Sequence, residues 1–426
     1  MKKLYLSLLA FLGAILLALG VWSLAALDWA SLPPLTAQSV FDHSAESSFE
    51  SRLGDRFPMR NLLLKGNQTM NLFYYFSVGE ENLLAIDYKG GAEAGGERLA
   101  DLPEPVPAVE LPEIDLPEET DVMAVGTVIV NGNRAMDIPT AEDEIITEFG
   151  NAVNRIAAAM PEQTRTFLLV TPNGGQFYSP PSYHTGIHDQ SAMIRRCYDA
   201  LSDRVTAVDA YSPIARHCDE YLFFRTDHHW TQKGAYYAYS AFCDAAGFTA
   251  RELAEYESGS YEGFVGSMYN YLSSYPQSKV LEDNPDTLTY YLAPVATNAR
   301  YYADASLKNG AHVPLIDVAL RDTITNKYLC YLGGDTPICV IETEAEGGTC
   351  IVVKESFGNA FIPFLAEHYS KIIAIDPREF NDPDEPQLNL ASFAAEQNAD
   401  DLLIIDYPFM INSKAYVRIL NDLIPE

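Results

Sequence analysis

Two short segments hold side chains whose types and spacing suit acyl-ester chemistry. The first contains Asp227 and His229, two residues apart, and the second places Ser356 three residues after the end of an apolar run, residues 350–353. A serine hydroxyl is a weak nucleophile until a histidine, oriented by a carboxylate, accepts its proton. The sequence therefore offers Ser356 as a nucleophile, His229 as its base and Asp227 as the orienting acid.

The surroundings of Ser356 favour this interpretation. The apolar run before it is typical of a buried strand, and the residues after it are typical of a helix. A strand-to-helix turn would place the hydroxyl at the carboxyl edge of a parallel sheet, where such folds keep their sites. The backbone N–H of Ser356, at the positive end of the helix, would then help to stabilise an oxyanion.

Each signal also has a plainer explanation. A serine at the start of a helix is most often a cap, and a histidine in a loop is most often structural. His228 beside His229 raises a metal site as the lesser alternative. Neighbouring residues of an extended segment point to opposite sides, so these two histidines are expected to chelate one ion poorly. We predict no metal and no cofactor.

The N-terminus predicts a membrane anchor. Lys2 and Lys3 precede an uncharged apolar stretch, residues 4–27, which is longer than the about 20 residues that a spanning helix needs. Lysines before the stretch and none just after it place the N-terminus inside. We therefore expect a single-pass protein of the bacterial cell membrane whose C-terminal domain is extracytoplasmic. A cleaved signal peptide, cut near Ala25 and Ala26, is the alternative.

Composition narrows the class of protein. The formal net charge of −31 repels phosphate backbones, so nucleic-acid binding is not expected. A hydrophobic content of 48% is ample for a folded core. The six cysteines form no C-x-x-C pair, which leaves one or two disulfides or free buried thiols as alternatives.

Short apolar runs alternate with amphipathic segments from residue 122 onward. Helices are predicted over residues 140–160, with Thr140 as the cap, over 191–201 and over 234–246, which Gly247 ends. Strands are predicted at residues 125–130, 166–171, 205–209, 221–224, 328–332, 338–341, 350–353, 372–375 and 402–405. This alternation predicts a three-layer α/β fold with a mostly parallel sheet.

The chain is expected to divide into three parts. Residues 1–30 form the transmembrane anchor, and residues 31–121 contain a tether, a helical segment over 49–75 and a flexible linker. Residues 122–426 form the α/β domain. A tyrosine-rich insertion at about residues 249–322 is predicted within it, where tyrosines suit sugar stacking but more often serve packing.

The motifs also carry a family resemblance. The string from Phe224 to Trp230, continued by residues 234–239, resembles the signature of the DHHW protein family. The resemblance extends to residues 55–60, 354–369 and 375–378, and so covers most of the chain after the anchor. This family is similar to the SGNH-fold alginate O-acetyltransferases of the bacterial envelope. The resemblance therefore implies an SGNH-hydrolase-like fold.

The resemblance also implies roles for individual residues. Asp227 matches the orienting acid, His229 the base and Ser356 the nucleophile, with Arg225 and Trp230 as supporting motif residues. The order Asp, His, Ser differs from that of ordinary SGNH hydrolases, but triads are defined by geometry. Glu355 stands before the serine where the relatives usually have aspartate, and one extra methylene could loosen a turn that this carboxylate shapes.

The oxyanion donors are less clearly marked. Asn173 follows a predicted strand and corresponds to a loop asparagine of SGNH enzymes, although an ordinary turn residue explains it equally well. Gly333 and Gly334 offer backbone N–H groups after another predicted strand.

The expected function is acyl-ester chemistry, as an O-acetyltransferase or O-acetylesterase, on a cell-surface or exopolysaccharide glycan. The resemblance implies a membrane-embedded acyltransferase as the partner that supplies the acetyl group. The rival expectation is a non-catalytic carbohydrate-binding or polysaccharide-assembly protein on the same fold. Glycan binding without turnover would distinguish the rival from the enzyme.

Overall fold

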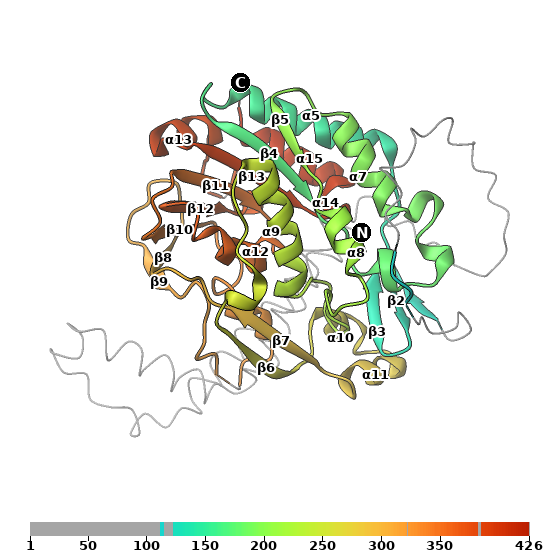
Figure 1. The fold of residues 1–426 in the computed structure, drawn as a ribbon. Helices are drawn as coiled ribbons and strands as arrows, with labels where there is room; N and C mark the ends of the chain where they lie inside the picture. The colour runs from blue at the N-terminus through green and yellow to red at the C-terminus, as the bar shows by residue number, and fades with distance from the viewer. Residues whose placement is uncertain (1–110, 115–121, 322, 382–384, 426) are drawn as a thin grey trace, which may run out of the picture. The chain divides into compact units, whose positions relative to one another are not determined.

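The computed structural model describes residues 111–114, 122–321, 323–381 and 385–425 (Figure 1). The predicted anchor and tether, the helix over residues 49–75 and most of the predicted linker lie outside this part of the chain. Among the described residues, no helix combines the length and the apolar character needed to cross a bilayer.

An eight-stranded mixed sheet forms the centre of the described domain, in the order β5-β4-β13-β11-β12-β10-β8-β9. The first five strands in this order are parallel to one another, while β10 pairs antiparallel with β12 and with β8, and β8 pairs antiparallel with β9. The mostly parallel sheet is therefore confirmed in its larger part. The strands are β4 (Arg165–Val170), β5 (Val205–Val208), β8 (Thr297–Tyr302), β9 (Ala311–Val313), β10 (Ile338–Thr343), β11 (Thr349–Lys354), β12 (Lys371–Ile375) and β13 (Asp401–Asp406).

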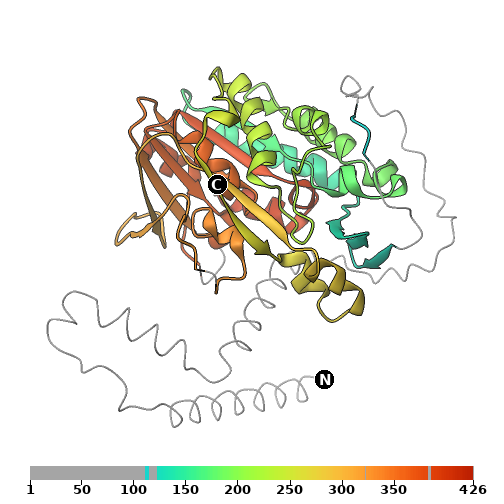
Figure 2. The same cartoon turned by 60° about the horizontal axis from the view of Figure 1, so that its bottom comes forward.

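Helices cover both faces of this sheet, which makes three layers (Figures 1 and 2). One face packs against α5 (Asp143–Ala159), α7 (Gln190–Asp199), α13 (Leu390–Gln397) and α15 (Lys414–Asp422). The other packs against α8 (Tyr211–Arg216), α9 (Gln232–Ala246) and α12 (Gly358–Leu365). The central strands are buried on both faces, which explains their continuous apolar runs.

Local signals set the helix ends. Thr231 caps α9 by accepting the Gly234 N–H, and the helix ends at Gly247, whose φ of 82° is left-handed. Helix α5 begins at Asp143 after Glu142, which makes no side-chain cap, so the prediction of Thr140 as its cap is wrong. The carbonyl of Thr140 instead accepts from the side chain of Asn412.

Three predicted strands differ in the structure. Residues 125–130 belong to a hairpin of β1 (Met123–Val125) and β2 (Val128–Asn131), which β3 (Arg134–Asp137) extends. Residues 221–224 contribute only an isolated bridge between Phe223 and Trp230. Residues 328–332 begin instead in a 3-10 turn, Lys327–Cys330, because Asn326 caps that turn, and Leu332 takes a positive φ of 57° that ends any extended run.

The tyrosine-rich segment is ordered. It forms the two-stranded sheet of β6 (Ser258–Phe264) and β7 (Asp286–Tyr291), the short helices α10 (Ser267–Leu272) and α11 (Lys279–Glu282), and the edge strands β8 and β9 of the main sheet. Two further short α-helices of the described chain are α6 (Gly175–Tyr178) and α14 (Pro408–Ile411).

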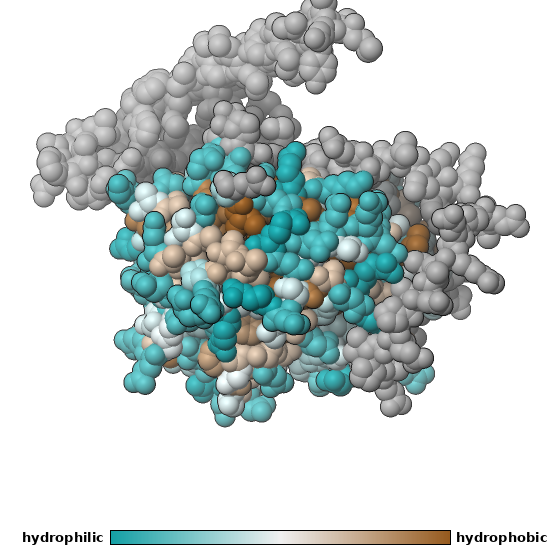
Figure 3. Space-filling model, turned by 90° about the horizontal axis from the view of Figure 1, so that it is seen from above, coloured by the Kyte–Doolittle hydropathy of each residue, from teal (hydrophilic) through white to brown (hydrophobic). Residues whose placement is uncertain are grey.

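The exposed face and the buried cysteines can be compared with what the composition predicts. The face shown in Figure 3 is largely hydrophilic, with hydrophobic residues gathered in limited areas. All six cysteines are free and buried, which selects the second of the two alternatives left open by the sequence.

Candidate active site

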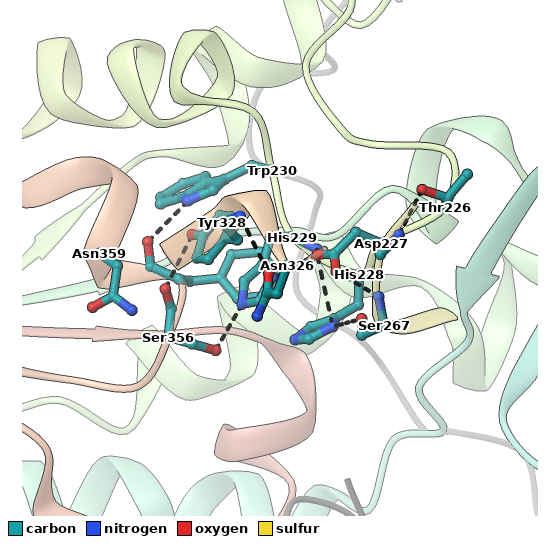
Figure 4. A network of polar contacts seen from close by, with 12 residues as sticks. Thr226, Asp227, His228, His229, Trp230, Ser267, Asn326, Tyr328, Ser356 and Asn359 are labelled. Atoms are coloured by element: carbon teal, nitrogen blue, oxygen red, sulfur yellow. Dashed lines mark hydrogen bonds and ion pairs between the residues drawn. The ribbon is translucent and has the colours of Figure 1, made fainter. Parts of the chain in front are cut away.

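Asp227, His229 and Ser356 form one chain of hydrogen bonds (Figure 4). His229 Nδ1 lies 2.6 Å from Asp227 Oδ1, and His229 Nε2 lies 2.7 Å from Ser356 Oγ. A carboxylate only accepts, so the ring proton belongs on Nδ1 and leaves Nε2 to accept the serine hydroxyl. This is the arrangement in which histidine can remove the serine proton.

The Asp227 carboxylate is held from three sides. Its Oδ1 also accepts the backbone N–H of His229 at 3.0 Å, and its Oδ2 accepts the backbone N–H of Ser267 at 2.8 Å. Gly266 makes this approach possible, because a Cβ at that position would lie 2.3 Å from the Asp227 Cβ. The insertion thus supplies the backbone that orients the acid.

Arg225 and the next residue are anchored by Asp286, which is fully buried. Asp286 accepts from the backbone N–H and hydroxyl of Thr226, at 2.8 and 2.6 Å, and from the backbone N–H and Nε of Arg225, both at 3.1 Å. Tyr221 donates to the same carboxylate. Asp286 therefore fixes the loop that carries the acid and the base, and Arg225 takes part through its side chain.

Two rings enclose His229. The Tyr328 ring stacks on one side with centroids 3.9 Å apart, and the His228 ring lies on the other at 3.8 Å. The expectation that His228 and His229 point to opposite sides is therefore wrong. The residues form a bend, closed by the hydrogen bond from the His229 N–H to Asp227, instead of an extended segment.

The two histidines and Asp227 bring three potential metal ligands within 4.8 Å of one another. Their ring Nδ1 atoms are already engaged, that of His229 by Asp227 and that of His228 by Ser267 Oγ at 2.6 Å. Figure 4 shows the His228 ring beside His229, with the edge that faces away from Ser267 turned to the side of Ser356. In this structure the Nδ1 atoms of the two histidines therefore make hydrogen bonds within the site.

The surroundings of Asp227 and His228 shift the pKa of each side chain. Burial alone would raise the pKa of Asp227, but the adjacent His229 and its hydrogen bond bring that pKa well below the ordinary value. Burial, followed by the neighbouring His229, lowers the pKa of His228 to about 3. Asp227 is therefore an anion and His228 a neutral ring at neutral pH.

Ser356 lies in the turn between β11 and α12, as predicted. Trp230 is completely buried and donates from Nε1 to the carbonyl of Phe357 at 2.9 Å. Tyr328 donates from its hydroxyl to the carbonyl of Ser356 at 3.0 Å. These two bonds tie the base-carrying loop and the Tyr328 turn to the backbone of the nucleophile.

The Glu355 side chain contacts this turn through one of its carboxylate oxygens. Its Oε2 accepts the backbone N–H of Phe357 at 3.1 Å and lies 3.3 Å from Ser356 Oγ. The extra methylene relative to aspartate therefore still allows the carboxylate to reach the turn. Glu355 is buried and its Oε1 has no partner among the described residues.

The oxyanion candidates are not hydrogen-bonded to the three residues of the site within the described chain. Asn173 is buried, and its Oδ1 accepts from the Gly175 N–H and from Gln190, both at 2.8 Å. This leaves its Nδ2 as a buried donor without a partner in the described structure. The N–H of Gly334 is used within its own turn, donating to Tyr331 at 3.0 Å.

Three supporting residues were missed by the sequence reasoning: Ser267, Asp286 and Tyr328. Ser267 and Asp286 come from the insertion, about 40 and 60 positions after the residues they hold. No local motif marks such contacts. Tyr328 was assigned to a strand, and the cap at Asn326 was the available signal against that assignment.

Comparison with known proteins places these motifs in a family. The sequence profile described as "DHHW protein" matches residues 118–375. A DHHW family protein from Eubacterium siraeum is 26% identical, with a TM-score of 0.62 over 72% of this chain and 99% of that chain. PatB1 of Bacillus cereus is 17% identical, with a TM-score of 0.54 over 70% of this chain and 99% of that chain. PatB1 with a sulfonyl adduct gives a TM-score of 0.53 at 17% identity, over 68% of this chain and 96% of that chain. No curated protein matches the chain.

Proposed function

Because the chain belongs to the DHHW protein family, we propose that it transfers or hydrolyses acyl esters, with Ser356 as the nucleophile and a glycan hydroxyl or water as the acceptor. One observation carries the proposal. The 2.7 Å contact between Ser356 Oγ and His229 Nε2 continues into the 2.6 Å contact with Asp227. The family resemblance to SGNH-fold O-acetyltransferases supports acetyl as the acyl group.

The first half of the reaction forms an acyl-enzyme. Ser356 Oγ attacks the ester carbonyl while its proton passes to His229 Nε2, and Asp227 stabilises the imidazolium that results. The leaving oxygen then takes the proton from His229 as the carbonyl re-forms. In the second half, a sugar hydroxyl or water gives its proton to His229 and attacks the acyl carbon, and Ser356 regains a proton.

The negative oxygen of the tetrahedral intermediate needs donors. The Ser356 backbone N–H at the start of α12 is the first candidate, followed by the free Nδ2 of Asn173 and the N–H of Gly333. Each removed donor is expected to lower the rate about 10²–10³-fold. Asn173→Ala therefore gives a direct test of that side chain.

The function is tested by comparing wild type with Ser356→Ala on 4-nitrophenyl acetate, with mass spectrometry of the protein after a short incubation. We expect a burst of 4-nitrophenolate and an acetyl group on Ser356 in the wild type alone. Equal turnover by both proteins would contradict the nucleophile. Absence of any burst, together with measurable glycan binding, would identify a non-catalytic binding protein.

We further propose that residues 4–27 anchor the domain outside the cytoplasm, near a membrane-embedded acyltransferase that supplies the acetyl group. The charge and length of that segment support this topology. Mass spectrometry of the membrane fraction should find the N-terminal segment intact. A soluble product that begins near Leu27 would show a cleaved signal, and protection of the whole domain from protease in wall-less cells would place it inside.

A further inference from the structure

Two buried carboxyl groups lie side by side below the nucleophile. Parallel pairing of β11 with β13 places Lys354 opposite Ile405, so Glu355 and Asp406, the next residue of each chain segment, are neighbours. Side chains alternate along a strand, so both face the sheet layer that packs against α15. Asp406 is completely buried, and neither of its oxygens has a hydrogen-bond partner among the described residues.

The nearby cations are already matched by other acids. Lys354 Nζ lies 2.9 Å from Asp335 Oδ1, and Arg378 Nη2 lies 3.0 Å from Asp335 Oδ2. Arg378 also binds Asp376 at 2.5 Å. These bonds engage Lys354 and Arg378 with Asp335 and Asp376. A second negative charge on Glu355 and Asp406 would have to share Arg378 with those carboxylates, and a poorly compensated buried charge is unfavourable.

We propose that Glu355 and Asp406 form a buried acid pair that carries a single negative charge at neutral pH, with Asp406 protonated and Glu355 acting as the positioning residue for the Ser356 turn. Glu355 is the better site for the charge because its Oε2 accepts the Phe357 N–H. The Asp406 oxygens accept no hydrogen bond among the described residues, although the Tyr416 hydroxyl lies near them. The Asp406 proton is then available to the free Glu355 Oε1.

The titration of the pair follows from burial. Burial raises the pKa of Glu355 to about 7, and burial together with the charge of Glu355 raises the pKa of Asp406 well above its ordinary value. Arg378 opposes both shifts and His229 opposes the first, while Asp335 adds to the first and Asp376 to the second. Tyr328, Tyr416 and Cys197 also face the pair.

The pair has a consequence for the nucleophile that rests on the proposed function. The Ser356 hydroxyl has two acceptors in reach, His229 Nε2 at 2.7 Å and Glu355 Oε2 at 3.3 Å. A Glu355 carboxylate that accepts a hydrogen bond from protonated Asp406 is a weaker acceptor for the serine. The hydroxyl therefore keeps donating to His229.

The pair can be tested without any turnover, using the full chain. Infrared difference spectra between wild type and Asp406→Asn at pH 7 should show the C=O stretch of one protonated carboxyl that the variant lacks. In chemical unfolding between pH 5 and 7, each proton that unfolding releases raises the unfolding constant about tenfold per pH unit. We expect the slope of the logarithm of this constant against pH to be lower by one proton in Asp406→Asn. The slope should be unchanged in Asp244→Asn, which replaces an exposed acid on α9.

These measurements distinguish a failure of the acid-pair proposal from a failure of the proposed acyl-ester function. If Asp406→Asn does not fold, the same difference spectrum at pH 7 is taken between wild type and Asp406→Ala, so that Asp137, whose pKa burial also raises to about 7, contributes equally to both spectra. Lack of this band at pH 7, or an unchanged slope in Asp406→Asn, overturns the pair. Its effect on Ser356 is read from the pH profile of inactivation by phenylmethylsulfonyl fluoride. Asp406→Ala should shift that profile and Asp406→Asn should restore it, and identical profiles in all three proteins would contradict the positioning role.

Discussion

Replacement of Asp227 by asparagine exchanges one oxygen for an NH2 group, yet we expect it to remove most of the activity at Ser356. One carboxylate oxygen accepts the ring and backbone N–H groups of His229, and the other accepts the N–H of Ser267. An amide has a single accepting oxygen, so one of these two sides must face an NH2 group.

The structure limits the outcome to two arrangements. If the amide oxygen faces Ser267, the NH2 group donates to His229 Nδ1 and moves the ring proton to Nε2, which can no longer accept the serine proton. This tautomer is expected to lower kcat about 10⁴-fold, or about 5 kcal/mol. If the oxygen faces His229, the Ser267 N–H loses its acceptor at a cost of about 1–3 kcal/mol, and the imidazolium still loses its counter-charge.

The assay is the rate of the 4-nitrophenolate burst in Asp227→Asn, with Asp244→Asn as the matched control and thermal unfolding as the check on folding. The control should acylate at the wild-type rate because Asp244 is exposed on α9, away from the site. A folded Asp227→Asn variant that keeps more than about a tenth of the wild-type rate would refute the role of Asp227, since general-base catalysis contributes about 10²–10⁴-fold.

Other perturbations test separate contacts. His228→Ala removes a ring that lies tilted against His229 and should lower the acylation rate about tenfold, well short of the 10²–10⁴-fold loss for His229→Ala; equal losses restored by added zinc would favour a metal site. Gly266→Ala should displace Asp227 and lower the acylation rate with only a small change in melting temperature, and an unchanged rate would contradict the required close approach. Burial raises the pKa of Asp137 to about 7, so the folded state favours the protonated carboxyl. The contribution of this protonated Asp137 to the free energy of unfolding is complete below about pH 4 and is lost as the pH rises to about 7. Asp137→Asn should therefore flatten the fall in unfolding free energy over this range, by on the order of 4 kcal/mol in total, in denaturant titrations; a slope equal to that of wild type would refute this.

The sequence was sufficient for the elements that depend on local signals. The strand before Ser356 and the helix predicted over residues 234–246, which Gly247 ends, could be predicted because apolar runs and caps act within a few residues. The turn that carries Ser356 follows a strand as predicted, whereas Asp227 and His229 follow an isolated bridge residue instead of the strand predicted at residues 221–224.

The remainder depends on contacts that sequence spacing does not reveal. The direction of the His228 ring follows from a bend that Asp227 closes, and an alternating pattern predicts the opposite direction. The support from Ser267 and Asp286 comes from a distant insertion. The run at residues 328–332 has strand-like composition, but the cap at Asn326 and the positive φ of Leu332 determine its actual conformation.

The hydrogen bond from Trp230 to the carbonyl of Phe357 gives the site an optical reporter of its own assembly. The chain has three tryptophans, at positions 22, 29 and 230, so Trp230 is the one that lies beyond the predicted anchor. Its indole joins the base-carrying loop to a nucleophile turn that lies 127 positions later. In refolding of a chain that lacks residues 1–30, tryptophan emission should therefore change as these two segments dock, and reactivity at Ser356 should develop with the same time course.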